Sequence, residues 1–244
     1  MSGRQTMKLG RKAVKTDSRT LCLNRYLLDT LPAPPDAVDW TKGITDFGMM
    51  LNDQLGDCTV AALGHAVQVW TANSRTEGTV TDEVIESAYE AWDGYQPGNP
   101  ATDNGGIALD TLNDFKRDTL AGHVLTAFAA ATVANTTEIK QAVNLFGGVY
   151  AGLQFPESAF DQDTWDVVDD DGGGAGGHCV YIAGYNSTGP LAISWGKLYQ
   201  MTWAFWLRYF DESFALFSPD WLAANVAPNG FNLNQLTADL AAIR

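Results

Sequence analysis

The sequence predicts an α+β protein built from a helical lobe and a β-rich lobe, with a cleft between them. Apolar residues recur at helical spacing through most of residues 57–122, whereas the part after residue 122 consists mainly of short apolar segments separated by glycine, asparagine and aspartate. With 244 residues, the chain is also long enough to bury a large core. A helical half followed by a β half therefore indicates two lobes that pack against each other.

The first half of the chain is expected to form three helices. The first begins after Asp57, whose side chain can cap it, and carries one row of apolar residues, namely Val60, Leu63, Ala66, Val67 and Trp70. The second covers residues 79–92, and the third covers residues 107–121 and stops at Gly122.

The second half is expected to contain five strands and one helix. The helix covers residues 135–147, with Asn135 or Thr136 as its cap, and residues 166–177 are expected to be an acidic, glycine-rich loop. A short amphipathic helix is expected at residues 235–244. The strands are expected at residues 123–133, 147–155, 178–186, 190–196 and 201–210.

The N-terminal segment is basic, whereas the rest of the chain is acidic. Residues 1–25 carry seven basic side chains and a single acid, Asp17, which gives a net charge of +6. The whole chain carries −14, so the remainder carries −20. We expect this arm to lie on an acidic surface of its own chain, and the alternative is that it docks on an acidic partner. The prolines of residues 31–40 then exclude helix and lead to Trp40, a first core anchor.

Composition excludes several classes of function. A strongly acidic chain argues against a nucleic-acid partner, and no apolar run is long enough to span a bilayer. The basic start lacks the apolar segment of a secretory signal, so we expect cytoplasmic synthesis. Three cysteines cannot all pair within one chain, and their spacing fits neither a disulfide framework nor a zinc site. No metal and no cofactor are expected.

The residues suggest one thiol site. Cys58 stands at the start of the first helix, where unpaired N–H groups and the helix dipole favour a thiolate. A thiol nucleophile also needs a base, and the chain has three histidines. His65 lies too far along the same helix to reach Cys58, and His123 has no polar residues around it. His178, at the start of an apolar strand after the glycine-rich loop, is therefore the candidate base.

The motifs around these residues resemble those of the papain-like cysteine peptidases. Trp40 lies 18 residues before Cys58, and "HCVYIAGY" begins at His178, as in that family. Asn52, six residues before Cys58, stands where the family has the glutamine of the oxyanion hole. The "DNGG" of residues 103–106 and the "SWG" of residues 194–196 match two further family segments. The "GDC" ending in Cys58 is also similar to the calpain-type branch, which is intracellular.

The resemblance implies a papain-like fold, a peptide-cleaving thiol chemistry and a set of site residues. Cys58 and His178 would form the thiolate–imidazolium pair, and Asn52 or Gln54 would complete the oxyanion hole with the Cys58 N–H. Polypeptide substrate would pair with the backbone of Gly105 and Gly106, and Trp195 would shield His178.

One departure from the family concerns the third catalytic residue. Ile193 stands where the family has an asparagine, and isoleucine cannot accept the imidazole N–H. Ser194, Asn186 or a backbone carbonyl is the candidate replacement. The departure also favours an alternative function, a papain-like module without turnover that binds a protein partner within a larger particle, such as a virion or phage tail. A cell-wall amidase ranks last, because Cys58 and His178 are 120 residues apart.

The resemblance also suggests domain boundaries. Residues 1–37 would be a basic arm or a vestigial prosegment. Residues 38–228 would form the papain-like domain, with a helical lobe at about 50–125 and a β lobe at about 126–228. Residues 229–244 would be a helical tail.

Overall fold

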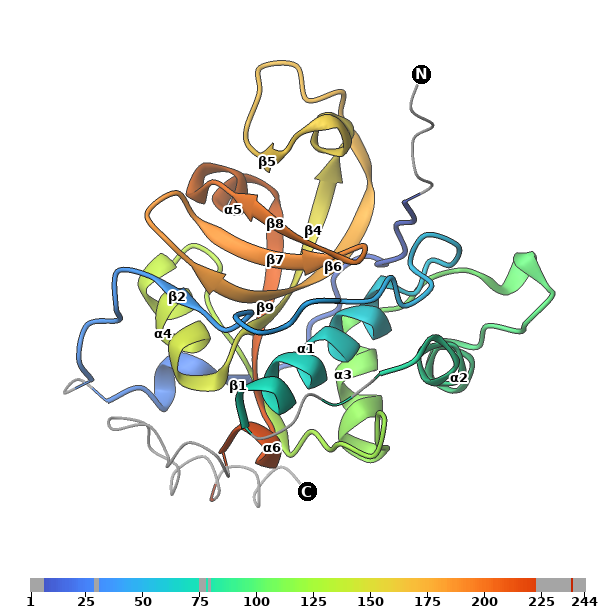
Figure 1. The fold of residues 1–244 in the computed structure, drawn as a ribbon, viewed down its shortest axis with the longest axis horizontal. Helices are drawn as coiled ribbons and strands as arrows, with labels where there is room; N and C mark the ends of the chain where they lie inside the picture. The colour runs from blue at the N-terminus through green and yellow to red at the C-terminus, as the bar shows by residue number, and fades with distance from the viewer. Residues whose placement is uncertain (1–6, 29–30, 75–77, 79, 223–237, 239–244) are drawn as a thin grey trace.

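The computed structural model describes residues 7–28, 31–74, 78, 80–222 and 238, and it has the expected α+β architecture. Figure 1 shows α1, α2 and α3 grouped in the lower part of the view and strands β4 to β8 with α5 in the upper part. The helices are α1 (Cys58–Ser74), α2 (Asp82–Asp93), α3 (Ala108–Arg117), α4 (Thr136–Phe146), α5 (Trp203–Tyr209) and α6 (Pro219–Leu222).

The strands form one nine-stranded sheet in the order β1-β3-β9-β4-β6-β7-β8-β5, and β2 pairs with β6 outside this order. Strands β4, β6, β7, β8 and β9 pair with one another in antiparallel fashion. Their bounds are β1 (Leu21–Cys22), β2 (Val38–Asp39), β3 (Ala127–Ala130), β4 (Val149–Pro156), β5 (Thr164–Trp165), β6 (Gly174–Tyr185), β7 (Pro190–Ser194), β8 (Lys197–Met201) and β9 (Phe210–Phe217).

Two hydrophobic cores lie on the two faces of the sheet. Successive side chains of a strand point to opposite faces, so Val180 and Ile182 of β6 enter the core that contains α4, whereas Cys179 and Tyr181 enter the core that contains α1. Trp40 packs against both cores, as expected of an early core anchor. This arrangement places the start of α1 against the face of β6 that carries Cys179.

The helical first half agrees with the sequence pattern, apart from the end of the third helix. α1 begins at Cys58 and α2 at Asp82, after Thr81. α3 ends at Arg117, several residues before Gly122, because Asp118 already adopts an extended conformation. The fourth helix is capped as predicted, since the Asn135 side chain accepts a hydrogen bond from the Glu138 N–H at 3.2 Å.

The prediction of a strand at residues 201–210 is wrong. Residues Trp203–Tyr209 form α5, whose N-cap Thr202 accepts a hydrogen bond from the Phe205 N–H at 3.0 Å. The buried side chains Phe205, Trp206 and Tyr209 follow helical spacing. Aromatic composition favoured a strand here, but the cap and burial on one helix face decide the local structure.

The second half differs from the prediction in further places, and strand β8 and helix α6 were not predicted. The strand expected at residues 123–133 is shorter, because only Ala127–Ala130 form β3. Part of the expected glycine-rich loop is strand, since β6 starts at Gly174. Strand β9 was not predicted, and the helix expected at residues 235–244 lies outside the described residues apart from residue 238. The boundaries of the lobes remain predictions.

Candidate active site

Cys58 is the first residue of α1 and is fully buried. The preceding Asp57 is also buried, and its carbonyl oxygen accepts the N–H groups of Val60 and Ala61 in the first turn. Burial raises the pKa of the Cys58 thiol to about 12, although the backbone of Cys179 and that of Gly10 act to lower it. The thiol is therefore neutral near pH 7 in this structure.

His178 lies on β6 and is held on two sides. Its Nε2 lies 2.7 Å from the Ser194 Oγ at the end of β7. Its ring stacks on Trp195, with centroids 4.2 Å apart, and meets Phe155 edge-on. Nδ1 is buried without a hydrogen-bond partner. Burial lowers the pKa of His178 to about 3, so the ring is neutral near pH 7.

The two candidate catalytic residues are not hydrogen-bonded to each other. Among the residues that the structure describes, no hydrogen bond joins Cys58 to His178. Cys58 belongs to the core around α1, and its thiol interacts with the backbone of Cys179, the residue next to His178. In this form both groups are neutral, and no thiolate–imidazolium pair is formed.

The two candidate oxyanion donors lie in the loop before α1. Both N–H bonds of the Asn52 amide are used within this loop, because Nδ2 donates to the Leu55 oxygen at 3.2 Å and to the Asp57 carboxylate at 3.0 Å. The Gln54 side chain is exposed. Gln54 is therefore the freer of the two candidate donors, while Asn52 supports the turn that leads into α1.

Of the two candidates to orient the histidine, the structure brings Ser194 to it. Asn186 instead occupies the turn between β6 and β7, where Nδ2 donates to the Gln200 side chain at 2.6 Å and Oδ1 accepts the Thr188 N–H. Ile193 is fully buried in the core around α1. Ile193 and Ser194 point to opposite faces of β7, so only the serine reaches His178.

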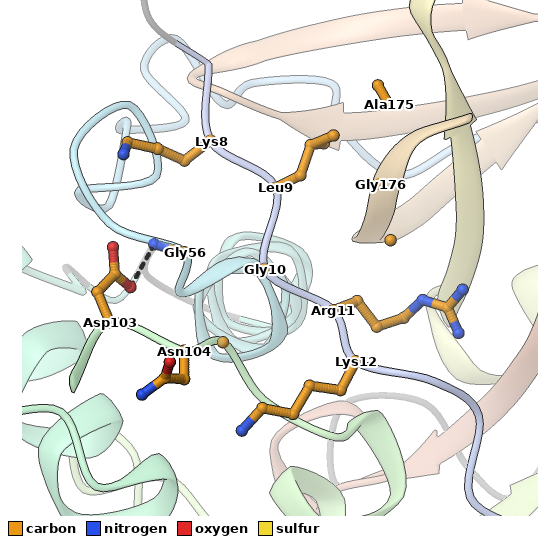
Figure 2. A pocket seen from close by; sticks show the side chains of 12 residues that line it. Lys8, Leu9, Gly10, Arg11, Lys12, Gly56, Asp103, Asn104, Ala175 and Gly176 are labelled. Atoms are coloured by element: carbon orange, nitrogen blue, oxygen red, sulfur yellow. Dashed lines mark hydrogen bonds between the residues drawn. The ribbon is translucent and has the colours of Figure 1, made fainter. Parts of the chain in front are cut away.

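The N-terminal arm occupies the cleft. Arg11 pairs with Gly106 in a parallel bridge, in which the Gly106 N–H donates to Gly10 and the Lys12 N–H donates to Gly106. On the other side, the Arg11 N–H donates to the Gly177 oxygen of β6 at 2.9 Å. Figure 2 shows the arm passing between Gly56 on one side and Ala175–Gly176 on the other.

The arm fits closely against the protein because several glycines along its path have no side chain. A Cβ on Gly10 would lie 1.7 Å from the Gly56 oxygen, and one on Gly105 would lie 1.8 Å from the Gly10 oxygen. A Cβ on Gly177 would lie 2.1 Å from the Arg11 oxygen. The predicted substrate-pairing residues Gly105 and Gly106 thus meet the protein's own arm, which lies over the start of α1.

Arg11 anchors the arm through ion pairs with two acids of β9, of which Glu212 is buried and Asp211 is exposed. Its guanidinium donates from Nη1 to the Glu212 carboxylate at 2.7 Å and from Nη2 to the Asp211 carboxylate at 2.8 Å. The arm also reaches an exposed acid, since the Lys15 ammonium lies 2.7 Å from the Asp110 carboxylate. Sequence reasoning missed the acidic pair on β9, although the two adjacent acids in an otherwise apolar segment were a visible signal.

The described part of the chain holds neither a candidate metal cluster nor a candidate membrane span. Within it, no three histidine, cysteine or acidic side chains gather as a metal site would require. None of the helices formed there has the length and apolar character needed to cross a bilayer.

Comparison with solved structures shows which known fold the chain has. No family model and no curated protein sequence matches the chain. Among solved structures it is similar to xylellain, a cysteine protease from Xylella fastidiosa, with a TM-score of 0.66 and 14% identity over 88% of this chain and 98% of xylellain. It is also similar to digestive procathepsin L 3 of Tenebrio molitor, with a TM-score of 0.57 and 12% identity over 87% of this chain and 76% of that one.

A third similar structure is bromelain from Ananas comosus in complex with the E64 inhibitor, with a TM-score of 0.51 and 13% identity over 75% of this chain and 98% of bromelain. All three likenesses cover three quarters or more of this chain. The protein therefore has the fold of the papain-like cysteine proteases.

Proposed function

We propose that the protein is a thiol-dependent hydrolase that cleaves peptide bonds in polypeptide substrates, with Cys58 as nucleophile and His178 as base. The observation that carries the proposal is the setting of His178, whose Nε2 meets the Ser194 hydroxyl while Nδ1 has no partner. We propose the tautomer in which Nε2 donates its proton to the Ser194 oxygen and Nδ1 is free to accept a proton from a thiol.

The reaction follows from these two groups. Cys58 gives its proton to Nδ1 of His178, and the thiolate sulfur bonds to the substrate carbonyl carbon. The imidazolium then protonates the leaving amine as the C–N bond breaks, which leaves an acyl-enzyme. Finally, water loses a proton to His178 and attacks the acyl carbon, which releases the acid and restores the thiol.

The surrounding residues would support this chemistry. The backbone N–H of Cys58 and the Gln54 amide are the proposed donors to the oxyanion, and each good donor contributes roughly 3 kcal/mol. Gly105 and Gly106 are the proposed partners of the substrate backbone, which would pair with them as an added strand. Trp195 shields one face of the His178 ring from water.

The reactive form needs the arm to leave the cleft. The Cys58 thiol is fully buried beneath residues that include Gly10, and burial disfavours both members of the ion pair. Water entering the cleft would lower the pKa of Cys58 and raise that of His178. We infer that the structure is the closed form of the hydrolase.

The test is covalent labelling of Cys58 with an E64-type epoxide in the full chain, mapped by mass spectrometry. Gly10→Ala should expel the arm, because its Cβ would lie 1.7 Å from the Gly56 oxygen. We expect this variant to label at Cys58 about 10-fold or more faster than wild type. The exposed Cys22 serves as a reference thiol in the same spectrum.

Three further variants complete the test. Val14→Ala changes an exposed arm residue and should label like wild type. Cys58→Ala should abolish peptide hydrolysis by the Gly10→Ala protein, and His178→Ala should slow its labelling. If Cys58 of the Gly10→Ala protein reacts no faster than Cys22, or if Cys58→Ala leaves hydrolysis unchanged, the proposed function is wrong.

The second candidate function is a papain-like module without turnover that binds a protein partner in a larger assembly. It is favoured by one observation, the burial of Cys58 and His178 without a hydrogen bond between them. A module of this kind would keep the arm in the cleft and show no hydrolysis in the Gly10→Ala variant. The labelling experiment therefore separates the two functions.

A further inference from the structure

The arginine of the arm lies in a pocket that is built for it. The Arg11 side chain has no exposed surface, and its two terminal nitrogens each meet a different carboxylate, those of Asp211 and Glu212. Gly152 of β4 forms one wall, where a Cβ would lie 2.7 Å from both the Arg11 Cδ and the Glu212 Oε1. The missing side chain at Gly152 makes room for the guanidinium.

A β-bulge brings the two carboxylates together. On a regular strand, neighbouring residues point to opposite faces, so Asp211 and Glu212 would not share a ligand. The pairing of β4 with β9 shifts at this point, because Gly152 pairs with Glu212 while Leu153 pairs with Phe210. Asp211 is thus the extra residue of a bulge, a feature that re-aims side chains beside functional sites.

The backbone of Arg11 is held where a substrate backbone is expected. Arg11 forms the bridge with Gly106 and donates its N–H to Gly177. The adjacent Gly10 interacts with the Cys58 thiol. In an extended chain, a residue that pairs with Gly106 would thus place its side chain near the Asp211–Glu212 pocket. The residue next to it in that chain would lie over Cys58, as Gly10 does in the arm.

Removal of the arm would leave the Glu212 carboxylate without the Arg11 guanidinium. Glu212 is buried, and its Oε2 has no hydrogen-bond partner even with the arm in place. Without Arg11, its Oε1 loses the cation that compensates for burial. A buried carboxylate then needs either a proton or another cation. The forked pair of acceptors suits a guanidinium better than an ammonium.

From these contacts we infer that the pocket formed by Gly152, Asp211 and Glu212 is a specificity subsite for an arginine side chain of the polypeptide substrate, at the substrate residue that pairs with Gly106. This inference rests on the proposed function only in describing the bound peptide as a substrate. The pocket itself is a binding site for a peptide arginine whether or not the bound peptide is cleaved.

The test measures peptide binding to the full chain with an open, vacant cleft. Gly10→Ala and Arg11→Ala together expel the arm and remove its guanidinium, and Cys58→Ala prevents turnover. A short peptide with a central arginine is compared with the same peptide carrying citrulline, which has the shape of arginine without its charge. We expect the arginine peptide to bind roughly 10- to 100-fold more tightly.

A matched pair of acid substitutions completes the experiment. In the same background, Glu212→Gln should reduce the preference for arginine over citrulline, whereas Glu90→Gln, at an exposed acid of α2, should leave it unchanged. If the combined variant fails to fold, the single Gly10→Ala protein is labelled with epoxides that carry arginine or citrulline, and their labelling rates are compared.

The outcomes separate this inference from the proposed function. Equal binding of the two peptides, or no binding of either, overturns the arginine subsite. Preferential binding of the arginine peptide together with absent Cys58 labelling and hydrolysis supports the subsite and overturns the hydrolase. A preference for arginine in both binding and cleavage supports both.

Discussion

At the scale of the residue, a shift of one position along β7 decides which side chain meets His178. The motif match aligned Ile193 with the family asparagine, but Ile193 is buried in the core around α1. The next residue, Ser194, reaches Nε2 of the histidine at 2.7 Å. A serine oxygen can accept the ring N–H as an amide oxygen does, so we expect Ser194 to orient the imidazole in place of the asparagine.

The contribution of Ser194 can be measured in the arm-open Gly10→Ala protein. Ser194→Ala should lower kcat/KM roughly 10- to 100-fold, a part of the general acid–base contribution, because the imidazolium loses its acceptor. The alkaline limb of the pH–rate profile should shift to lower pH, because an imidazolium without that acceptor has a lower pKa and loses its proton earlier as the pH rises. Kinetic profiles over pH give both results.

The control for Ser194→Ala is Ser187→Ala, at an exposed serine of the turn between β6 and β7. It should leave kcat/KM and the pH profile as they are. An unchanged pH profile in Ser194→Ala would show that the serine only packs against the ring. In that case Ser194→Asn should not raise kcat/KM above that of Ser194→Ala.

At the scale of elements, α2 ends in a half-buried carboxylate, that of Asp93, beside the arm. Burial raises the pKa of Asp93 to about 7, and the charge of Lys12 partly opposes this rise. The Asp93 carboxylate lies against Gly106, where a Cβ would be 2.6 Å from its Oδ1. A carboxylate at a helix C-terminus also meets the negative end of the dipole. Asp93 is therefore a destabilising charge in the folded state.

Asp93→Asn should make stability depend less on pH. The pKa of Asp93 is higher in the folded than in the unfolded state, so the folded wild type holds this proton more tightly and loses stability as pH rises from about 4 to about 7. Asparagine has no proton to lose. The stability gain of the variant should therefore grow across this range, by up to about 1 kcal/mol per pH unit, and level off above pH 7.

Urea unfolding at several pH values measures this gain. Glu90→Gln, at an exposed acid of the same helix, changes the net charge equally without removing a half-buried carboxylate. A pH-dependent gain of the same size in both variants would assign the effect to net charge, and the interpretation of Asp93 would be wrong.

For the whole molecule, Trp40 ties the two cores together. Its indole N–H donates to the Val143 oxygen of α4 at 2.8 Å, and its ring lies 4.9 Å from that of Trp221. Its carbonyl oxygen accepts a hydrogen bond from Asn73 of α1 at 2.8 Å. One residue thus contacts elements on both faces of the sheet.

Trp40→Ala should lower the free energy of unfolding by roughly 3 kcal/mol, because it leaves a cavity and removes a hydrogen bond to Val143. Chemical denaturation followed by circular dichroism measures the change. Leu207→Ala, at a half-exposed residue of α5, should change stability by less than about 0.5 kcal/mol. Similar losses in both variants would mean that Trp40 is not a joint between the cores.

Much of the molecule was predictable from local patterns. Apolar spacing located α1 and α2, and the register of Cys58 with Trp40 and the segment at His178 indicated the fold. The same patterns failed at residues 203–209, where aromatic composition favours a strand but a capped helix with one buried face forms.

The sequence by itself determined the two lobes, the helix-start cysteine and the candidate histidine, because spacing along the chain is local information. Only the tertiary structure decided that Ser194 meets His178, that the arm fills the cleft and that Arg11 meets Glu212. These last two residues are 201 positions apart. Their meeting depends on glycines at the cleft and on a bulge in β9, neither of which leaves a periodic pattern in the sequence.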